Sequence, residues 1–347
     1  MKPRTPSSYR DAGVDIDLAD RAKRRIKRLA RKTFTPAVLT EIGGFGGLFR
    51  LDRKGLRQPV LVSSVDGVGT KLKVAFATGI HHTVGKDLVC HCVNDILVQG
   101  AVPLFFMDYI ATGRMEPDVI ARIVEGLAAG CREAGCALLG GETAEMPGFY
   151  ADGEYDLAGF VVGVVDKSKI LDGRRIRPGD TLVGLPSAGL HTNGYSLARK
   201  LLFDVAGYDP GSFDEELGET VGQALLRPHL SYLKALQPLT AAGALKGMAH
   251  ITGGGLTDNI PRVLPANCRA VIRLGSWSVP PIFGLLQKLG SIGDEEMLRT
   301  FNMGIGMVVI VGRQALPKVE QHLHKVKQPY FRIGEVREGG ARVVYET

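Results

Sequence analysis

The chain of 347 residues is 45% hydrophobic and 23% charged, which is typical of a folded globular protein and excludes collagen-like and largely disordered chains. The net charge of +7 comes from residues 21–32, where eight Lys and Arg side chains stand without an acid; removing those eight charges from +7 leaves −1. The longest apolar stretch, Ala158–Val165, is too short to cross a bilayer as a helix. No apolar leader follows Lys2 and Arg4, so we expect a soluble, cytoplasmic protein with no membrane partner.

The cysteines do not indicate a metal site or a disulfide framework. The Cys90-His91-Cys92 run lacks the C-x-x-C spacing of a structural zinc site. Four of the five cysteines lie in apolar runs, so we expect buried thiols in a reducing compartment. The five are Cys90, Cys92, Cys131, Cys136 and Cys268.

The first predicted element is a basic helix over residues 21–32, preceded by a polar segment around Tyr9–Val14. Such a run is either a surface for nucleic acid or membrane or, more often, the solvated face of a helix. We favour the solvated face, with the last turn left available to an anionic substrate. The loop Gly43–Gly47 lacks the spacing of a dinucleotide fingerprint and leads into a predicted strand at residues 48–51.

A second predicted strand, Val60–Val62, runs into the sequence Asp66-Gly67-Val68-Gly69-Thr70-Lys71. The glycines allow the backbone to approach a ligand closely, and a carboxylate such as Asp66 is a good Mg²⁺ ligand. Thr70 and Lys71 offer a hydroxyl and an ammonium to phosphate. The spacing is not that of a Walker A loop, and taken alone the stretch is better explained by a tight turn with a solvated lysine.

Residues 85–99 are predicted to form a helix with an apolar stripe and a narrow polar one. Asp87, His91, Asn94 and Asp95 recur at helical spacing, and a polar stripe on such an apolar helix needs partners. We expect Asn94 and Asp95 to face the same metal and phosphates as Asp66. The alternative is that they cap neighbouring loops, and His91 is expected to be a packing residue rather than a ligand.

The first predicted domain continues with a strand at 104–110, a helix at 117–134 and a short strand at 137–139. That strand ends at Gly140-Gly141-Glu142, which makes Glu142 a third candidate metal ligand, with Glu145 as the alternative. A strand at 157–165 closes the domain. The turn-rich stretch after it places the boundary so that the domains are 1–168 and 169–347.

In the second half, two polar loops follow predicted strands at 181–185 and 247–251. Residues 187–196 precede a helix through residue 202, and Thr252–Gly255 precede another. Free N–H groups at such positions can hold an anion, although helix capping explains the same residues. Strands near 270–274, 305–311, 332–335 and 342–345 alternate with helices and are expected to be scaffold.

Carboxylates on separate elements together with Lys71 indicate an enzyme that uses ATP and Mg²⁺ on a phosphorylated substrate, because phosphoryl transfer depends on positioning and charge neutralisation. The residues alone do not identify the substrate.

Two motifs of the chain are specific: Gly-Gly-Glu-Thr-Ala-Glu-Met-Pro-Gly at 140–148 and His-Thr-Asn-Gly-Tyr-Ser at 191–196. They stand in order with residues 9–15, 43–47, 65–71, 94–95 and 252–255. This series resembles the phosphoribosylformylglycinamidine cyclo-ligase family over nearly the whole chain. The resemblance implies ATP-dependent closure of formylglycinamidine ribonucleotide to aminoimidazole ribonucleotide in purine biosynthesis. It also implies an α/β fold of mixed sheets, with two domains, a homodimer through the N-terminal sheet and a segment at residues 9–15 folded over the nucleotide.

On this resemblance we assign roles to individual residues. Lys71 is expected to neutralise ATP phosphates, and His191 is the candidate general acid or base, or else a hydrogen-bond partner of the substrate without proton transfer. The catalytic set is His191, Lys71 and Asp66, and the metal set is Asp66, Asp95 and Glu142. The ATP set is Asp66, Gly67, Gly69, Thr70, Lys71, Asn94, Asp95, Gly141 and Glu142. The substrate set is Asn193, Tyr195, Ser196, Thr252, Gly253, Gly254 and Gly255.

Three related enzyme families and a nucleic-acid-binding protein are the rival interpretations, and each requires a sequence feature that can be checked. Selenophosphate synthetase, of the same superfamily, usually relies on a reactive cysteine near the N-terminus, and the first cysteine here is Cys90. The two specific motifs favour the cyclo-ligase family over thiamine-phosphate kinase and the hydrogenase-maturation dehydratase. A nucleic-acid-binding protein would use residues 21–32, but aromatic residues do not interleave with that run, which argues against nucleic acid as a partner.

Overall fold

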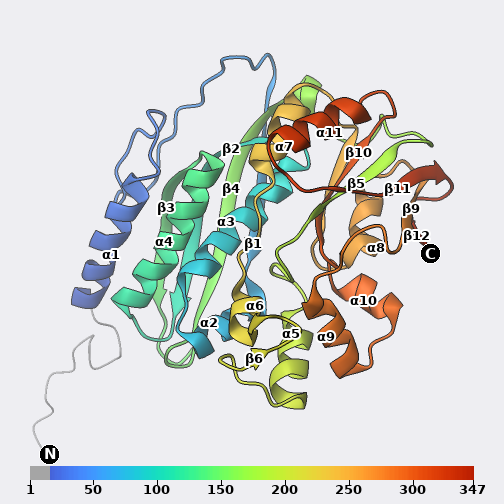
Figure 1. Ribbon diagram of the computed structural model, residues 1–347. Helices are drawn as coiled ribbons and strands as arrows, with labels where there is room; N and C mark the ends of the chain where they lie inside the picture. Colours follow the sequence, from blue (N-terminus) through green and yellow to red (C-terminus); the bar gives the residue numbers. More distant parts are fainter. Residues whose placement is uncertain (1–15) are drawn as a thin grey trace, which may run out of the picture.

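The computed structural model describes residues 16–347 and contains two main sheets (Figure 1). The segment at residues 9–15 that the resemblance places over the nucleotide lies outside the described residues. The first sheet has the strand order β1-β4-β2-β3, in which β4 pairs antiparallel with β1 and β2 while β3 pairs parallel with β2. Its strands are β1 (Pro59–Gly67), β2 (Val102–Thr112), β3 (Ala137–Glu145) and β4 (Tyr155–Asp166).

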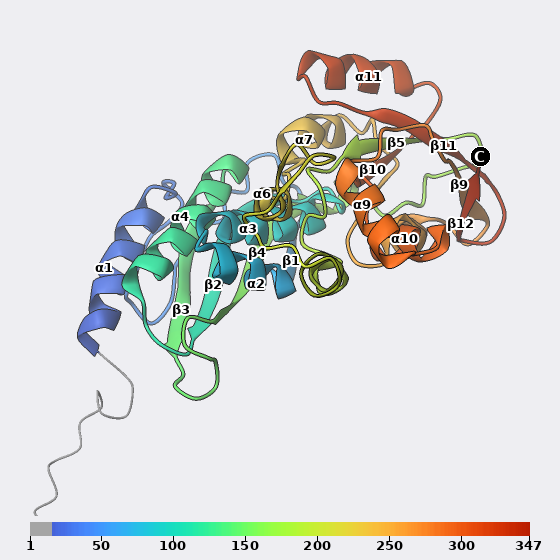
Figure 2. The ribbon, with the colours of Figure 1, turned by 60° about the horizontal axis from the view of Figure 1, so that its bottom comes forward.

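One face of the first sheet is covered by helices and the other exposes apolar side chains. Helices α3 (His82–Leu97) and α4 (Pro117–Ala134) pack on the covered face, and α1 (Ile16–Arg31) lies beside α4 (Figure 2). On the opposite face, Leu61 is 62% exposed and Phe160 45% exposed, and Val65 and Met107 are also exposed. This alternation gives the sheet an apolar surface without a partner among the described residues.

The second sheet has six strands in the order β12-β9-β11-β5-β10-β8. The two faces of this sheet pack into different hydrophobic cores. Val183 and Leu185 belong to the large core that also fills the first domain, whereas Leu182 belongs to a smaller core around Trp277. Its strands are β5 (Thr181–Pro186), β8 (Gly247–His250), β9 (Cys268–Arg273), β10 (Ile305–Val311), β11 (Phe331–Glu338) and β12 (Val343–Glu346). The shared core packs the two domains against each other.

The remaining elements are short and link the strands and helices of the two domains, and two of them pair as a separate two-stranded sheet. They are η1 (Gly69–Lys71), α2 (Leu72–Thr78), η2 (Lys167–Lys169), α5 (Tyr195–Arg199), η3 (Lys200–Val205), β6 (Phe213–Asp214), β7 (Glu219–Thr220), α6 (Val221–Leu226), α7 (Leu233–Ala241), α8 (Gly255–Asn259), η4 (Ile260–Val263), α9 (Pro281–Gly290), α10 (Asp294–Thr300) and α11 (Leu316–Lys325). None of the helices in residues 16–347 combines the length and apolar character that a bilayer crossing requires.

The structure confirms a mixed α/β fold and most predicted elements, with corrections to three predicted strands. The strand predicted at 48–51 is wrong, because within residues 16–347 this stretch makes a single isolated bridge, from Phe49 to Val38. Strands β1 and β3 are longer than predicted: β1 continues through Asp66 and Gly67, and β3 includes Gly140–Glu142, which were expected in loops after them. All five cysteines are buried and unpaired, as predicted. The boundary between residues 168 and 169 stays a prediction; it falls within η2.

Helices α3 and α4 cross with their backbones in contact, and glycine makes this crossing possible. A Cβ on Gly126 would lie less than 3.0 Å from the carbonyl oxygen of His82, and one on Gly85 equally close to that of Ile123. Backbone atoms cannot rotate away as a side chain can, so either methyl group would push the helices apart. This crossing fixes α3, which carries the polar stripe, against the sheet.

We therefore expect Gly126→Ala to lower the free energy of unfolding by about 3 kcal/mol, the upper end of the usual overpacking cost. Urea denaturation followed by circular dichroism measures it. Gly284→Ala in α9 is the matched control, because a Cβ there meets nothing within 4 Å and alanine is the better helix former. Equal effects of the two substitutions would contradict the close crossing.

Candidate active site

The polar stripe of α3 lies at the interface between the two domains, which we call the seam. Each side chain of the stripe has a partner on another element. Asp87 pairs with Lys71, and His91 with Asp66 at the end of β1. Asn94 and Asp95 contact the second domain through Leu230 and His250. The expectation that this stripe needs partners is met, and the partners join the β1 end, α3 and the second domain in one cluster.

Lys71 lies at the centre of the seam rather than in an open loop. Its ammonium and the carboxylate of Asp87 are both 0% exposed and 2.7 Å apart. The ammonium also donates to the backbone carbonyls of His191 at 3.1 Å and Arg227 at 2.9 Å. These contacts occupy the donors that we expected to face ATP phosphates, so the structure gives Lys71 a different set of partners.

Asn94 also has its amide group occupied. Its Nδ2 donates to the carbonyl of Leu230 at 2.8 Å, and its Oδ1 accepts from the backbone N–H of Tyr232 at 3.1 Å. Both groups hold the connection between α6 and α7. The structure therefore favours the alternative that Asn94 caps a neighbouring loop, in place of the expected ATP contact.

Asp66 and Asp95 are the two carboxylates of the seam that reach solvent. Asp66 Oδ2 is 3.1 Å from His91 Nε2, and Asp95 Oδ1 is 2.7 Å from His250 Nδ1. The carboxylate side chains are 35% and 30% exposed, whereas the imidazoles behind them are buried. The seam thus has two carboxylates that face solvent, which we call the outward carboxylates, and each one contacts a buried imidazole.

His191 has a positive φ of 61° and is buried against a second imidazole. Its ring stacks on His229 with centroids 3.9 Å apart, its Nε2 accepts from the N–H of Ala188 at 3.1 Å, and its Nδ1 has no hydrogen-bond partner within residues 16–347. Burial, aided by the nearby charges of His250 and Lys71, holds the pKa of His191 well below its usual range. The ring is therefore neutral at physiological pH, which does not suit a general acid.

The two loops of the second domain meet near the seam. Asn193 lies against Gly253, where an added Cβ would be 3.2 Å from Asn193 Oδ1, and Ser196 Oγ is 3.0 Å from Thr70 Oγ1. The side-chain amide of Asn259 ties the loop Thr252–Gly255 to α8 through three backbone carbonyls. Four segments, at residues 66–71, 191–196, 252–255 and α3, therefore surround one place.

Tyr195 differs from the rest of the expected substrate set. Its ring is buried, its hydroxyl donates to the carbonyl of Leu225 at 2.5 Å, and the ammonium of Lys71 lies 5.6 Å from its ring centroid. These contacts make Tyr195 part of the packing under the loop.

Glu142 does not join Asp66 and Asp95 within one chain. It lies on β3, which the strand order separates from β1 by β4 and β2. Since neighbouring strands are about 4.8 Å apart, the two edges are separated by roughly 14 Å. The expected three-carboxylate site is thus corrected to two carboxylates per chain. Glu145, the alternative ligand, is on the same strand and accepts from the N–H of Met115.

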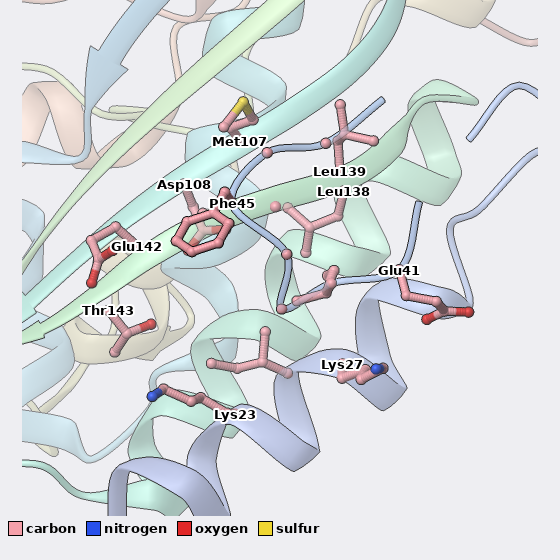
Figure 3. A pocket seen from close by; sticks show the side chains of 18 of the residues that line it. Lys23, Lys27, Glu41, Phe45, Met107, Asp108, Leu138, Leu139, Glu142 and Thr143 are labelled. Atoms are coloured by element: carbon pink, nitrogen blue, oxygen red, sulfur yellow. The ribbon is translucent and has the colours of Figure 1, made fainter. Parts of the chain in front are cut away.

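Beside β3 is a cavity of about 350 Å³ that residue patterns did not indicate. Figure 3 shows the lysine side chains of α1 at one side, Phe45 from the glycine loop, and Glu142 and Thr143 from β3. Its lining includes Lys23, Lys27, Phe45, Asp108, Leu139, Gly141 and Glu142. Burial raises the pKa of Asp108 to about 7. The cavity joins an apolar wall to cationic side chains, as a site for an aromatic anion would.

Sequence reasoning missed three residues of these sites. His229 and His250 are buried in the seam, and Asp108 is buried beneath Gly141. No local pattern marks them, because each acquires its role from a contact with a distant strand or helix.

Comparison with known proteins identifies both halves of the chain. Residues 52–165 match the family described as AIR synthase related protein, N-terminal domain, and residues 177–346 match its C-terminal domain. The chain is 54% identical over 336 residues to the phosphoribosylformylglycinamidine cyclo-ligase of Syntrophotalea carbinolica, covering 97% of this chain and 96% of that protein. It is 50% identical to that of Alkaliphilus metalliredigens, covering 97% of each.

Solved structures share the fold at low identity. A thiamine-monophosphate kinase from Stenotrophomonas maltophilia matches with a TM-score of 0.66 at 18% identity, over 96% of both chains. The hydrogenase maturation protein HypE, solved in complex with ATP, matches with a TM-score of 0.64 at 20% identity, over 92% of this chain and 89% of its own.

Because Lys71 and Asp87 are buried together, we expect Lys71→Met alone to destabilise the fold by about 3–5 kcal/mol, since it leaves an unpaired buried charge. Asp87→Leu combined with Lys71→Met should recover a large part of this loss. Chemical denaturation of the single and double variants measures the coupling. A double variant with the summed loss of both single variants would contradict the pairing.

Asp108→Asn should stabilise the protein in a pH-dependent way. The pKa of the Asp108 carboxyl is about 3.8 in the unfolded chain and about 7 in the folded protein. Between these two pH values the folded state binds more protons than the unfolded state, so the free energy of unfolding falls as the pH rises. Asparagine does not titrate, so the variant escapes this loss of stability. The variant should therefore be no more stable than the wild type at about pH 4, and its gain in stability should be complete above about pH 7. Melting temperatures of both proteins at pH 4.5, 6 and 8 measure it; a constant difference would contradict the shift.

Proposed function

The chain belongs to the phosphoribosylformylglycinamidine cyclo-ligase family, and from this premise we propose how its residues serve the reaction. The reaction is the ATP-dependent ring closure of formylglycinamidine ribonucleotide to 5-aminoimidazole ribonucleotide in purine biosynthesis. The observation that carries the assignment is identity above 50% over 97% of the chain. The seam between the domains, with its two outward carboxylates, is the place we propose for the chemistry.

We assign Asp66 and Asp95 to hold Mg²⁺ with the ATP phosphates. The donor set fits, because Mg²⁺ prefers carboxylate oxygens and keeps several waters, and both carboxylates are partly exposed. ATP supplies the phosphoryl group that turns the formyl oxygen into a leaving group. Gly67 and Gly69 keep the backbone beside Asp66 free of side chains, and Thr70, held by Ser196, offers a hydroxyl at the same edge.

Asn193, Ser196 and Thr252–Gly255 are proposed to hold the substrate between the two loops. Their contribution is to keep the amidine nitrogen and the formyl carbon of one molecule in contact while water is excluded, which favours an intramolecular attack. His191 is neutral, so we assign it a hydrogen bond or a supporting role in this loop rather than proton donation. Lys71 and Asn94 are proposed to fix the loops, since their polar groups are occupied by backbone partners.

The adenine end of ATP is assigned to the cavity beside β3. Its apolar wall suits a purine ring, and Lys23 and Lys27 suit the negative charge that follows it. This uses one side of the basic helix, which otherwise has a solvated face. Gly141 and Glu142 also line the cavity, so two of the expected ATP-site residues are located at this place.

A homodimer through the open face of the first sheet would bring the two sites together. Exposed apolar side chains on β1, β2 and β4 provide the surface. If the two-fold axis runs along the strands, the β1 edge of each sheet lies over the β3 edge of its partner. Glu142 of one subunit would then approach Asp66 and Asp95 of the other, which restores the three-carboxylate set across the interface.

We propose the cytoplasm as the compartment. The five buried, unpaired cysteines suit a reducing environment.

The test of the function is the release of ADP from Mg·ATP with and without formylglycinamidine ribonucleotide, alongside detection of the aminoimidazole product. ADP and product should appear together only when the substrate is present. ATP hydrolysis without product, or on thiamine phosphate instead, would overturn the assignment.

Mixing subunits tests the composition of the site. Asp66→Asn and Glu142→Gln should each lower kcat/KM at least about 100-fold, since a misplaced phosphate group is enough for such a loss. Co-expressed, they should regain about a quarter of wild-type activity, because half of the dimers would carry one intact site. The control is Asp66→Asn with Asp95→Asn, which should regain none. No recovery in the first mixture, with dimers present by size-exclusion chromatography, would contradict a shared site.

A further inference from the structure

Where the two outward carboxylates meet their imidazoles, three ligand atoms of the kinds that bind transition metals converge. They belong to His91, Asp95 and His250 and lie within 4.8 Å of one another. Asp66 Oδ2 is next to them, 3.1 Å from His91 Nε2. A tetrahedral zinc site with bonds of about 2.1 Å has ligand atoms roughly 3.4 Å apart. The cluster therefore needs only small side-chain adjustments to enclose an ion.

The far ring nitrogens of both imidazoles are held by partners. His91 Nδ1 is 2.8 Å from Thr192 Oγ1, and His250 Nε2 is 3.0 Å from His229 Nε2. Such outer hydrogen bonds orient metal-binding histidines and fix the tautomer that leaves the inner nitrogen free. Here they leave His91 Nε2 and His250 Nδ1 facing the carboxylates, which is the arrangement a ligand pair requires.

We propose that His91, Asp95 and His250, with Asp66 as the fourth ligand, form a site for a divalent transition metal such as Zn²⁺, Co²⁺ or Mn²⁺. Two imidazole nitrogens favour these ions over Mg²⁺, which prefers oxygen ligands and water. When the ion binds, it displaces the proton through which each inner nitrogen contacts its carboxylate, and that proton is released to solvent or carried by the outer nitrogen that faces Thr192 or His229.

The site has an entry path and a relation to the active site. Both imidazoles are buried, whereas both carboxylates are partly exposed, so an ion reaches the cluster from the carboxylate side. Asp95 Oδ1 faces His250, and its Oδ2 accepts from Ser64 at 3.2 Å. The transition-metal ion therefore shares both Asp66 and Asp95 with the proposed Mg²⁺ position, and it would fix the orientation of the carboxylates that face the nucleotide.

Titration of the metal-free full-length protein with Co²⁺, in excess Mg²⁺ and without ATP or substrate, tests the site. We expect one Co²⁺ per chain with the intense visible absorption of tetrahedral coordination, displaced by Zn²⁺ but not by further Mg²⁺. His91→Gln and His250→Gln should each weaken Co²⁺ binding by at least about 10-fold, and Thr192→Val, which removes an outer hydrogen bond, by about 10-fold. His324→Gln on the exposed side of α11 is the control and should leave binding unchanged.

Folding of each variant is checked by its melting temperature without metal, and Zn²⁺ should raise the melting temperature of the wild type and of His324→Gln by more than that of the three weakened variants. A weak octahedral spectrum that both His91→Gln and His250→Gln retain, or Co²⁺ that Mg²⁺ displaces, would overturn the proposal. Because binding is measured without the reaction, a protein that binds Co²⁺ but makes no aminoimidazole product would contradict only the proposed function.

Discussion

A fully buried ammonium at the junction of two domains needs a countercharge and hydrogen-bond acceptors, and the arrangement of the seam follows from this requirement. Lys71 receives its countercharge from Asp87 on α3 and its acceptors from the carbonyls of His191 and Arg227. The acceptors are in the second domain and the carboxylate is in the first. One side chain therefore ties the loop after β1 to the helix behind it and to two segments of the other domain. Separating the domains would remove the two carbonyl acceptors of Lys71, and these acceptors help to offset the cost of burying the Lys71–Asp87 pair.

Within the seam, some charged and polar side chains are buried and others reach solvent. Imidazoles and the Lys71–Asp87 pair lie inside, and the carboxylates of Asp66 and Asp95 lie at the surface, each backed by an imidazole. A carboxylate held from behind keeps one defined orientation toward a ligand in front, which is the preorganisation that phosphoryl chemistry needs. The two glycine-containing loops of the second domain close around this edge, so the site exists only when both domains are packed together.

The sequence was informative where a chemical requirement is local. The strand that precedes and carries Asp66, the polar stripe of α3 and the helix that starts at Pro117 were predictable, because periodicity and turn residues indicate them directly. The roles of Lys71 and Tyr195 were not, because each side chain donates to a backbone carbonyl at least 30 residues away. For Asn94 the sequence left two roles open, an ATP contact and the capping of a loop, and the structure favours the second. Glu142 shows a different reason: its motif was recognisable, but only the strand order reveals that β3 is at the opposite edge from β1. His229 and His250 carry no motif at all, and the seam alone gives them partners.

The central claim is that the outward carboxylates of the seam receive the phosphates. A crystal structure with a non-hydrolysable ATP analogue and Mg²⁺ tests it most directly. The account predicts the phosphates and the metal at Asp66 and Asp95, with the adenine in the cavity between α1 and β3 of the partner subunit. Phosphates bound away from both carboxylates, with Asp66 and Asp95 still paired only to their imidazoles, would contradict it.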